Sequence, residues 1–145
     1  MERFLEKVEI RWSDIDPNMH LRHSVYYDWG AYVRMSFMKA HGIDLPKLAA
    51  LKLGPVLLRE EAIFRREITF GDMIEVDLTL VKAKRDFSRI GMRHEITKNG
   101  DTLAAIVTVD YTWIDTVKRK LTIPPFELVA CFGLLPKHES FIWNE

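Results

Sequence analysis

The stretch that decides the fold is SVYYDWGAYVRMSFMKA, residues 24–40. Its apolar side chains recur at the three- and four-residue spacing of an α-helix, with Ser24 as the expected N-cap and Gly42 as the expected stop. Nearly every position around this helix is apolar or aromatic. The charged exceptions are Asp28, Arg34 and Lys39. Such a helix is expected to be mostly enclosed by the rest of the chain.

On both sides of the helix, the sequence alternates with the period of two that is typical of half-buried strands. The alternating runs are residues 4–12, 62–70, 74–80, 90–96 and 103–113. Gly71-Asp72 indicates a turn, and Asn99-Gly100 is the strongest hairpin signal in the chain. Three further expectations concern the connections and the C-terminus: a linker at residues 51–55, a short helix at 127–132 and an irregular aromatic tail after it.

This order is one strand, one long helix and then four strands joined mainly by short turns, which implies antiparallel neighbours. One sheet has one face to bury, and one apolar helix is present to cover it. The sequence therefore predicts a single α+β domain over residues 1–145, in which an antiparallel sheet of about five strands wraps one long helix. The open edges of such a sheet favour self-association.

Composition excludes several classes of function. The 145 residues include 21 basic and 21 acidic side chains, and this balance argues against nucleic acid as the main partner. The only cysteine, Cys131, has no partner for an intrachain disulfide, which fits a reducing compartment. The N-terminus has no apolar signal core, and no apolar stretch is long enough to span a bilayer. We therefore expect a cytoplasmic protein with no membrane partner.

Side chains that could carry chemistry gather just before the long helix. Asp14, Asp16, His20 and His23 fall within ten positions. Thioester hydrolysis needs a carboxylate or histidine to attack or to activate water, and donors for the oxygen that gains charge. The N-terminus of a helix supplies such donors. The same residue types also precede any capped helix, so composition alone favours a structural role.

Residues 11–20, RWSDIDPNMH, followed by Tyr26, resemble the signature of the 4-hydroxybenzoyl-CoA thioesterase family within the hotdog-fold superfamily. Residues 67–76, EITFGDMIEV, are similar to the second conserved stretch of that family. The resemblance implies a hotdog fold and an acyl-CoA thioesterase that releases free acid and CoA. It implies no cofactor beyond the CoA carried by the substrate, and a homodimer or homotetramer with its active sites between subunits.

By this resemblance, Asp16 is the catalytic carboxylate, either nucleophile or general base. His23 stands where the short-chain acyl-CoA thioesterases of the Tol-Pal type have a histidine, and its backbone N–H would polarise the thioester carbonyl. His20 and Tyr26 are expected to contact the substrate. Met19 occupies a position where the family usually has glycine, and a positive φ there would be costly for methionine.

A second group of candidates is basic. Lys82, Lys84, Arg85 and Arg89 cluster around one predicted strand junction, where they could hold the phosphates of a CoA nucleotide. Asp86 lies among them, so a solvated turn is an equally good interpretation.

The remaining polar candidates favour structural roles. Asp14 is expected to bond loop amides, and His94 to be a hydrogen-bonded core or interface histidine. Glu60 and Glu61 could line the site but are more typical of a solvated pair. We expect no metal site, because there is no Cys pair and no second carboxylate–histidine cluster at ligand spacing.

Two other functions remain open at this point. One is another enzyme on the same scaffold, such as an acyl-ACP thioesterase or a hydratase. The other is a non-catalytic dimer that binds acyl groups or CoA, in which the altered Met19 turn has removed activity. The identity of the acyl group is also open.

Overall fold

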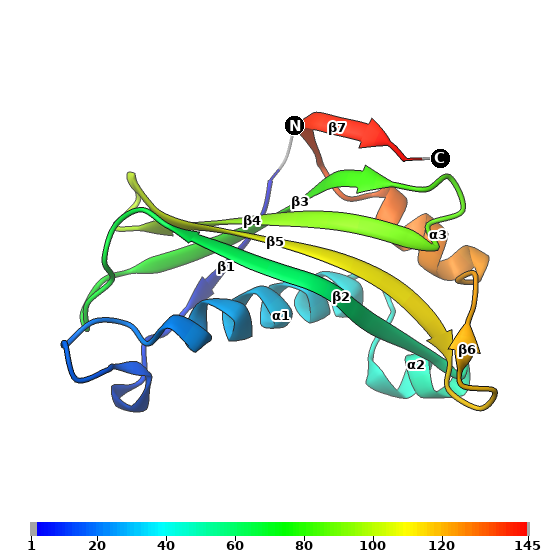
Figure 1. Ribbon diagram of the computed structural model, residues 1–145, viewed down its shortest axis with the longest axis horizontal. Coiled ribbons are helices and arrows are strands. Elements are labelled where there is room, and N and C mark those ends of the chain that lie inside the picture. The colour runs from blue at the N-terminus through cyan, green and yellow to red at the C-terminus, as the bar shows by residue number, and fades with distance from the viewer. Residues whose placement is uncertain (1–2, 145) are drawn as a thin grey trace.

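A curled sheet covers one side of a long helix in the structure, which is a computed structural model that describes residues 3–144 (Figure 1). The strands are β1 (Phe4–Val8), β2 (Leu53–Phe64), β3 (Ile74–Ala83), β4 (Arg89–Lys98), β5 (Thr102–Asp115), β6 (Lys120–Leu121) and β7 (Lys137–Trp143). The helices are α1 (His23–Ala40), α2 (Leu45–Ala50) and α3 (Phe126–Gly133), with a 3-10 turn at Trp12–Asp14. The predicted fold class is confirmed.

The main strands run in the order β1-β3-β4-β5-β2, and all neighbours in this path are antiparallel. β2 lies at one edge, where its only partner among residues 3–144 is β5. The other edge is shared, because β1 pairs with residues 74–78 of β3 and β7 pairs in parallel with residues 80–83. The expected turn at Gly71-Asp72 is present, but it does not join paired strands, since β2 ends at Phe64 and is not beside β3.

Helix α1 places its buried side chains against the concave face of the sheet. These are Val25, Tyr26, Trp29, Gly30, Val33, Arg34, Phe37 and Met38. Its other side is uncovered in the single chain, where Asp28, Ala31 and Tyr32 are exposed. The expectation of a mostly enclosed helix is therefore wrong for one chain, because the single sheet can cover only one side.

The two ends of α1 differ in how well the sequence predicts them. At the C-terminal end, Gly42 has a φ of +85°, and Gly42 N–H and Ile43 N–H donate to the carbonyls of Lys39 and Met38. These two bonds form a Schellman motif, which confirms the predicted stop. At the N-terminal end, the helix begins at His23 and the N-cap is Arg22, not Ser24. The Ser24 hydroxyl instead accepts a hydrogen bond from the Arg22 guanidinium at 2.6 Å.

Two connections differ from the sequence expectation. The linker expected at residues 51–55 includes the start of β2, which pairs from Leu53 along β5. The expected irregular tail is the strand β7, held to β3 by the parallel ladder and by the bond from Asn144 N–H to the Ala83 carbonyl. The short helix expected at 127–132 is present as α3.

Candidate active site

The loop between β1 and α1 is ordered by the first of its two aspartates. Asp14 is buried, and its carboxylate accepts hydrogen bonds from the Arg11 backbone N–H at 2.8 Å and the Arg11 guanidinium at 2.9 Å. Burial alone would raise the pKa of Asp14, but the bonds from Arg11 outweigh it and hold the pKa below its usual range. The expected structural role of Asp14 is confirmed.

Asp16 uses one carboxylate oxygen to shape the following turn. Its Oδ1 accepts from Asn18 N–H at 2.9 Å and from His20 N–H at 3.2 Å. Its backbone N–H donates to the His20 carbonyl at 2.8 Å. Within residues 3–144, Oδ2 has no hydrogen-bond partner. One oxygen therefore fixes the side chain and the other is left for chemistry.

The turn that Asp16 closes requires a left-handed residue. Met19 takes this conformation with a φ of +65° and donates its N–H to the Asp16 carbonyl. The loop therefore keeps the geometry that glycine would adopt easily, at a conformational cost to methionine.

A cleft of about 370 Å³ brings the predicted residues together. Asp16 and His20 line it from the loop, and His23 and Tyr26 line it from the first turn of α1. Residues 64–67, at and after the end of β2, form the opposite wall, where Glu67 Oε2 lies 3.1 Å from His20 Nε2. All four candidates from the loop and helix start thus share one hollow.

The start of α1 offers unused hydrogen-bond donors to this cleft. The N-cap Arg22 makes no side-chain capping bond, and the first turn of α1 contains no acidic residue. In the described part of the chain, the backbone N–H groups of His23 and Ser24 have no acceptor. Unpaired N–H groups at a helix start carry partial positive charge and suit an oxygen that becomes negative.

Tyr26 closes the inner side of the cleft. It is 4% exposed, and its ring packs edge-on against Phe64 with centroids 4.9 Å apart. Burial raises the pKa of Tyr26, and the negative charge of Asp16 raises it further. Tyr26 therefore stays protonated at neutral pH.

The predicted basic residues lie elsewhere in the same chain. The turn between β3 and β4, residues 84–88, is at the opposite end of the sheet from the loop of residues 11–22 (Figure 1). There Lys82 Nζ is 3.3 Å from Asp110, and the Arg85 guanidinium lies 4.6 Å from the centre of the Trp143 ring. Lys84 and Arg89 line a hollow of about 520 Å³. One chain does not bring these cations to Asp16.

Sequence reasoning missed a second basic turn at this end. Lys118 and Arg119 lie in the turn between β5 and β6, and Lys120 is the first residue of β6. Residues 121–123, which follow, line the same hollow as Lys84 and Arg89. The sequence signal for this second basic turn was the run of three basic residues itself. The hairpin between β5 and β6 was not predicted, so nothing linked this run to the other cations.

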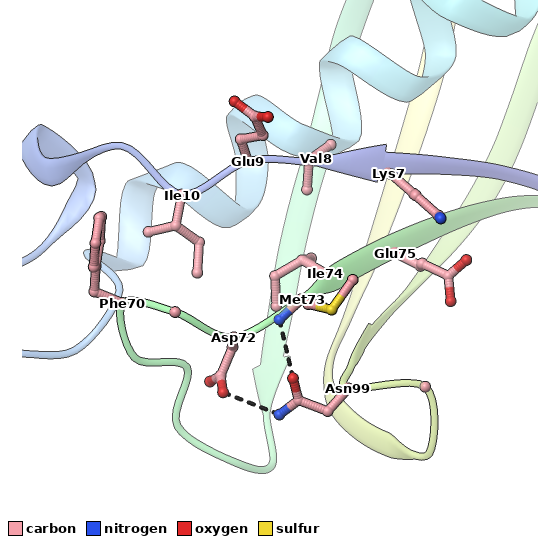
Figure 2. A pocket seen from close by; sticks show the side chains of 12 residues that line it. Lys7, Val8, Glu9, Ile10, Phe70, Asp72, Met73, Ile74, Glu75 and Asn99 are labelled. Atoms are coloured by element: carbon pink, nitrogen blue, oxygen red, sulfur yellow. Dashed lines mark hydrogen bonds between the residues drawn. The ribbon is translucent and has the colours of Figure 1, made fainter.

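A hollow larger than the cleft lies elsewhere. Its volume is about 770 Å³, and it lies between the end of β1 and residues 70–75. Figure 2 shows the side chains that line it. Its walls are mainly apolar, and the half-buried carboxylate of Asp72 accepts hydrogen bonds from Thr69 N–H and from the Asn99 amide.

No group of three or more His, Cys, Asp or Glu side chains within residues 3–144 could hold a metal ion. No helix in this range combines the length and apolar character needed to cross a bilayer.

Comparison with known protein families matches residues 10–132 to the thioesterase-like superfamily. Comparison with curated proteins finds no match. Among solved structures, a hypothetical protein from Staphylococcus aureus in complex with CoA aligns with a TM-score of 0.83 and 22% identity, over 99% of this chain and 90% of that one.

Two solved thioesterases show the same fold. A 1,4-dihydroxy-2-naphthoyl-CoA thioesterase from Synechocystis aligns with a TM-score of 0.81 and 17% identity, over 92% of this chain and 98% of that one. A thioesterase from Thermus thermophilus, complexed with coenzyme A and zinc, gives 0.73 and 23%, over 88% and 95%. With a family match that spans most of its length, the chain belongs to the thioesterase-like superfamily and is a thioester hydrolase with the hotdog fold.

Proposed function

We propose that this protein hydrolyses acyl-CoA thioesters to a free acid and CoA, with Asp16 as nucleophile or general base. The observation that carries the proposal is the cleft, because the residues that line it include Asp16, which has one uncommitted carboxylate oxygen, and His23, which has a free backbone N–H. The CoA carrier is supported by the two structural relatives that were solved with CoA.

The chemistry follows from these parts. The thioester carbonyl points at the N–H of His23, which stabilises the oxygen as it gains charge. As a base, Asp16 takes a proton from water, the hydroxide adds to the carbonyl carbon, and the C–S bond breaks to release a thiolate that is then protonated. As a nucleophile, Asp16 attacks the carbonyl carbon, the C–S bond breaks to release the thiolate, which is then protonated, and water hydrolyses the resulting mixed anhydride to the free acid and the Asp16 carboxylate. His20 and Tyr26 contact the acyl–pantetheine portion of the substrate.

A homodimer formed through β2 would bring the basic residues at one end of the sheet of one subunit close to the cleft of its partner. When a strand pairs with its own copy in antiparallel fashion, one end of the strand lies beside the opposite end of its copy. The Leu53 end of β2 belongs to the basic end of the sheet, and the Phe64 end belongs to the cleft. Lys82, Lys84, Arg85 and Arg89 of one subunit would then serve the cleft of the other, where CoA phosphates need cations.

The exposed side chains of β2 favour this edge for pairing. Leu57, Leu58, Ile63 and Phe64 are 44–52% exposed, although β2 is an edge strand of 12 residues. The opposite edge is made by the shorter strands β1 and β7, which carry several charged residues. Charged, short edges resist pairing, and long edges with apolar side chains favour it.

Size-exclusion chromatography with light scattering tests the assembly. We expect a dimer or a tetramer at micromolar concentration, and partial dissociation of Leu58→Glu, which places a charge on the proposed interface. A wild-type protein that is only monomeric would rule out the proposed arrangement of the cations at an interface between subunits.

A cytoplasmic location stays a prediction from the single cysteine.

The decisive test of the activity is Asp16→Asn in an assay of free-thiol release over acyl-CoA chain lengths. We expect kcat to fall by about 100-fold or more, because the loss removes the attacking or activating group. The matched control is Asp101→Asn, an exposed aspartate in the β4–β5 hairpin, with unchanged kcat. Near-normal hydrolysis by Asp16→Asn would remove Asp16 from its role. Turnover of acyl-ACP but not of acyl-CoA would identify ACP as the carrier of the acyl group. Binding of acyl-CoA without turnover would favour the non-catalytic dimer.

A further inference from the structure

The side chain of Tyr26 is buried, and the proposed mechanism gives no defined role to its hydroxyl, a polar group of the cleft. The Tyr26 ring is fixed by Phe64, with centroids 4.9 Å apart, and by Trp29 at 6.1 Å. With 4% exposure, the side chain has little room to take another position. The place of its hydroxyl is therefore set by packing.

This hydroxyl has no partner in the protein, although buried tyrosines usually find one. No hydrogen bond to it occurs within residues 3–144. That range also contains no buried side-chain nitrogen or oxygen without a partner. The Tyr26 oxygen must therefore reach accessible space, and the hollow that Tyr26 lines is the Asp16 cleft.

The helix directs this oxygen toward the donors at its own start. Tyr26 lies three residues after His23, so both side chains stand on the same face of α1. A long helical side chain leans toward the N-terminus and covers the preceding turn. The preceding turn is the one that carries the free N–H groups of His23 and Ser24.

The protonation state fixes what the hydroxyl can do. Burial and the charge of Asp16 both raise the pKa of Tyr26, so its O–H is present across the neutral range. A protonated phenol can donate a hydrogen bond but cannot act as a base. Asp16 occupies the basic role in the same cleft.

We propose that the Tyr26 hydroxyl donates a hydrogen bond to the thioester carbonyl oxygen, beside the backbone N–H of His23, and that Tyr26 is thus a catalytic residue. The inference rests on the proposed function, because it requires a thioester carbonyl in this cleft. No bond to Tyr26 forms or breaks, and its proton stays on the phenol. The bond strengthens as the carbonyl oxygen becomes negative, so it acts mainly in the transition state.

Tyr26→Phe removes the hydroxyl and keeps the packed ring. We expect kcat to fall by roughly 100- to 1,000-fold, the range for loss of one oxyanion donor, while KM changes little. The matched control is Tyr32→Phe, an exposed tyrosine that lines a different hollow, between α1 and β1, with both constants unchanged. An unchanged kcat in Tyr26→Phe would overturn the assignment.

Infrared difference spectroscopy separates contact with the carbonyl from a merely structural effect. The probe is an acyl-CoA analogue in which a methylene replaces the thioester sulfur, so that its ¹³C-labelled ketone is not hydrolysed. We expect the carbonyl stretch to move to lower frequency on binding to the wild type, and to move less in Tyr26→Phe. An equal shift in both proteins would overturn the role of Tyr26 but leave the proposed function intact. Failure of the analogue to bind the wild type would remove both.

Discussion

Two polar regions of this molecule use the same kinds of residues in opposite ways. The cleft leaves one oxygen of Asp16, the Tyr26 hydroxyl and two N–H groups of α1 without protein partners in the described chain. The second region is a cluster between α1 and the sheet, in which the buried Arg34 and His94 and the half-buried Tyr111 pair their polar groups within the protein.

The geometry of this cluster fixes the tautomer of its histidine. Arg34 donates to the Tyr111 hydroxyl and to His94 Nε2, both at 2.9 Å. A guanidinium can only donate, so Nε2 must be the acceptor and Nδ1–H must donate to the Asp77 carbonyl at 2.8 Å. Burial, with the charge of Arg34, lowers the pKa of His94 to about 3. This histidine is held neutral and is not free for acid–base chemistry.

The two regions differ in whether their polar atoms have hydrogen-bond partners within the protein. In this molecule, that difference distinguishes the candidate active site from a structural cluster better than residue type or pKa does. His94 has the most strongly shifted pKa of the histidines, yet its two nitrogens are both occupied. Removal of a cleft residue should therefore cost activity, and removal of a cluster residue should cost stability.

Arg34→Met is the strongest test of this division. It leaves the buried acceptor nitrogen of His94 and the hydroxyl of the half-buried Tyr111 without their donor. We expect a loss of roughly 3–5 kcal/mol in the free energy of unfolding, measured by urea denaturation, and an unchanged kcat per folded molecule. Lys39→Met, at an exposed cation of the same helix, serves as the control and should change stability little. A stable Arg34→Met protein with reduced kcat would place Arg34 in the site instead.

The neutral state of His94 predicts a second, smaller effect that depends on pH. In the unfolded chain, His94 binds a proton near pH 6.5, but in the folded protein its pKa is about 3. Because the unfolded state takes up the extra proton, stability falls as pH drops below 6.5, by about 1.4 kcal/mol per unit and thus by about 2 kcal/mol at pH 5.

His94→Gln provides the comparison for this slope. Glutamine offers an acceptor and a donor but does not titrate. Urea unfolding between pH 7 and pH 5 should show a shallower decline for His94→Gln than for the wild type. Equal slopes would mean that His94 is charged in the folded protein, and the tautomer deduced from Arg34 would then be wrong.

The sequence predicts the elements whose own residues determine them. The periodicity of residues 24–40 and the alternation of residues 74–80 and 103–113 locate α1, β3 and β5, because burial of one face imposes those spacings. Gly42 marks the end of α1, because few other residues take a positive φ without cost. Ser24 misleads, since its hydroxyl is engaged by Arg22 inside the first turn.

What depends on distant parts of the chain escapes prediction. β7 looks irregular in sequence, and it is a strand because β1 leaves the second half of β3 unpaired. At the site, the motif identified the residues that the cleft brings together, namely Asp16, His20, His23 and Tyr26. It could not show which of their atoms stay unpaired, since that depends on the turn geometry and on Phe64.

Met19 gives the smallest of the expected effects. Its strained backbone lies in the loop of the cleft, so relief of this strain should change stability and leave activity unchanged. Its φ of +65° costs an L-residue roughly 1–2 kcal/mol, whereas glycine avoids this cost but gains freedom in the unfolded chain. With 59% exposure, Met19 has little packing to lose. We therefore expect Met19→Gly to raise the free energy of unfolding by about 0.5–1 kcal/mol in urea denaturation, with unchanged kcat. Met19→Ala keeps the strain and should give no gain. If glycine also gives none, or lowers kcat, the left-handed turn is maintained by contacts of the methionine itself, and the cleft depends on this residue as well as on Asp16.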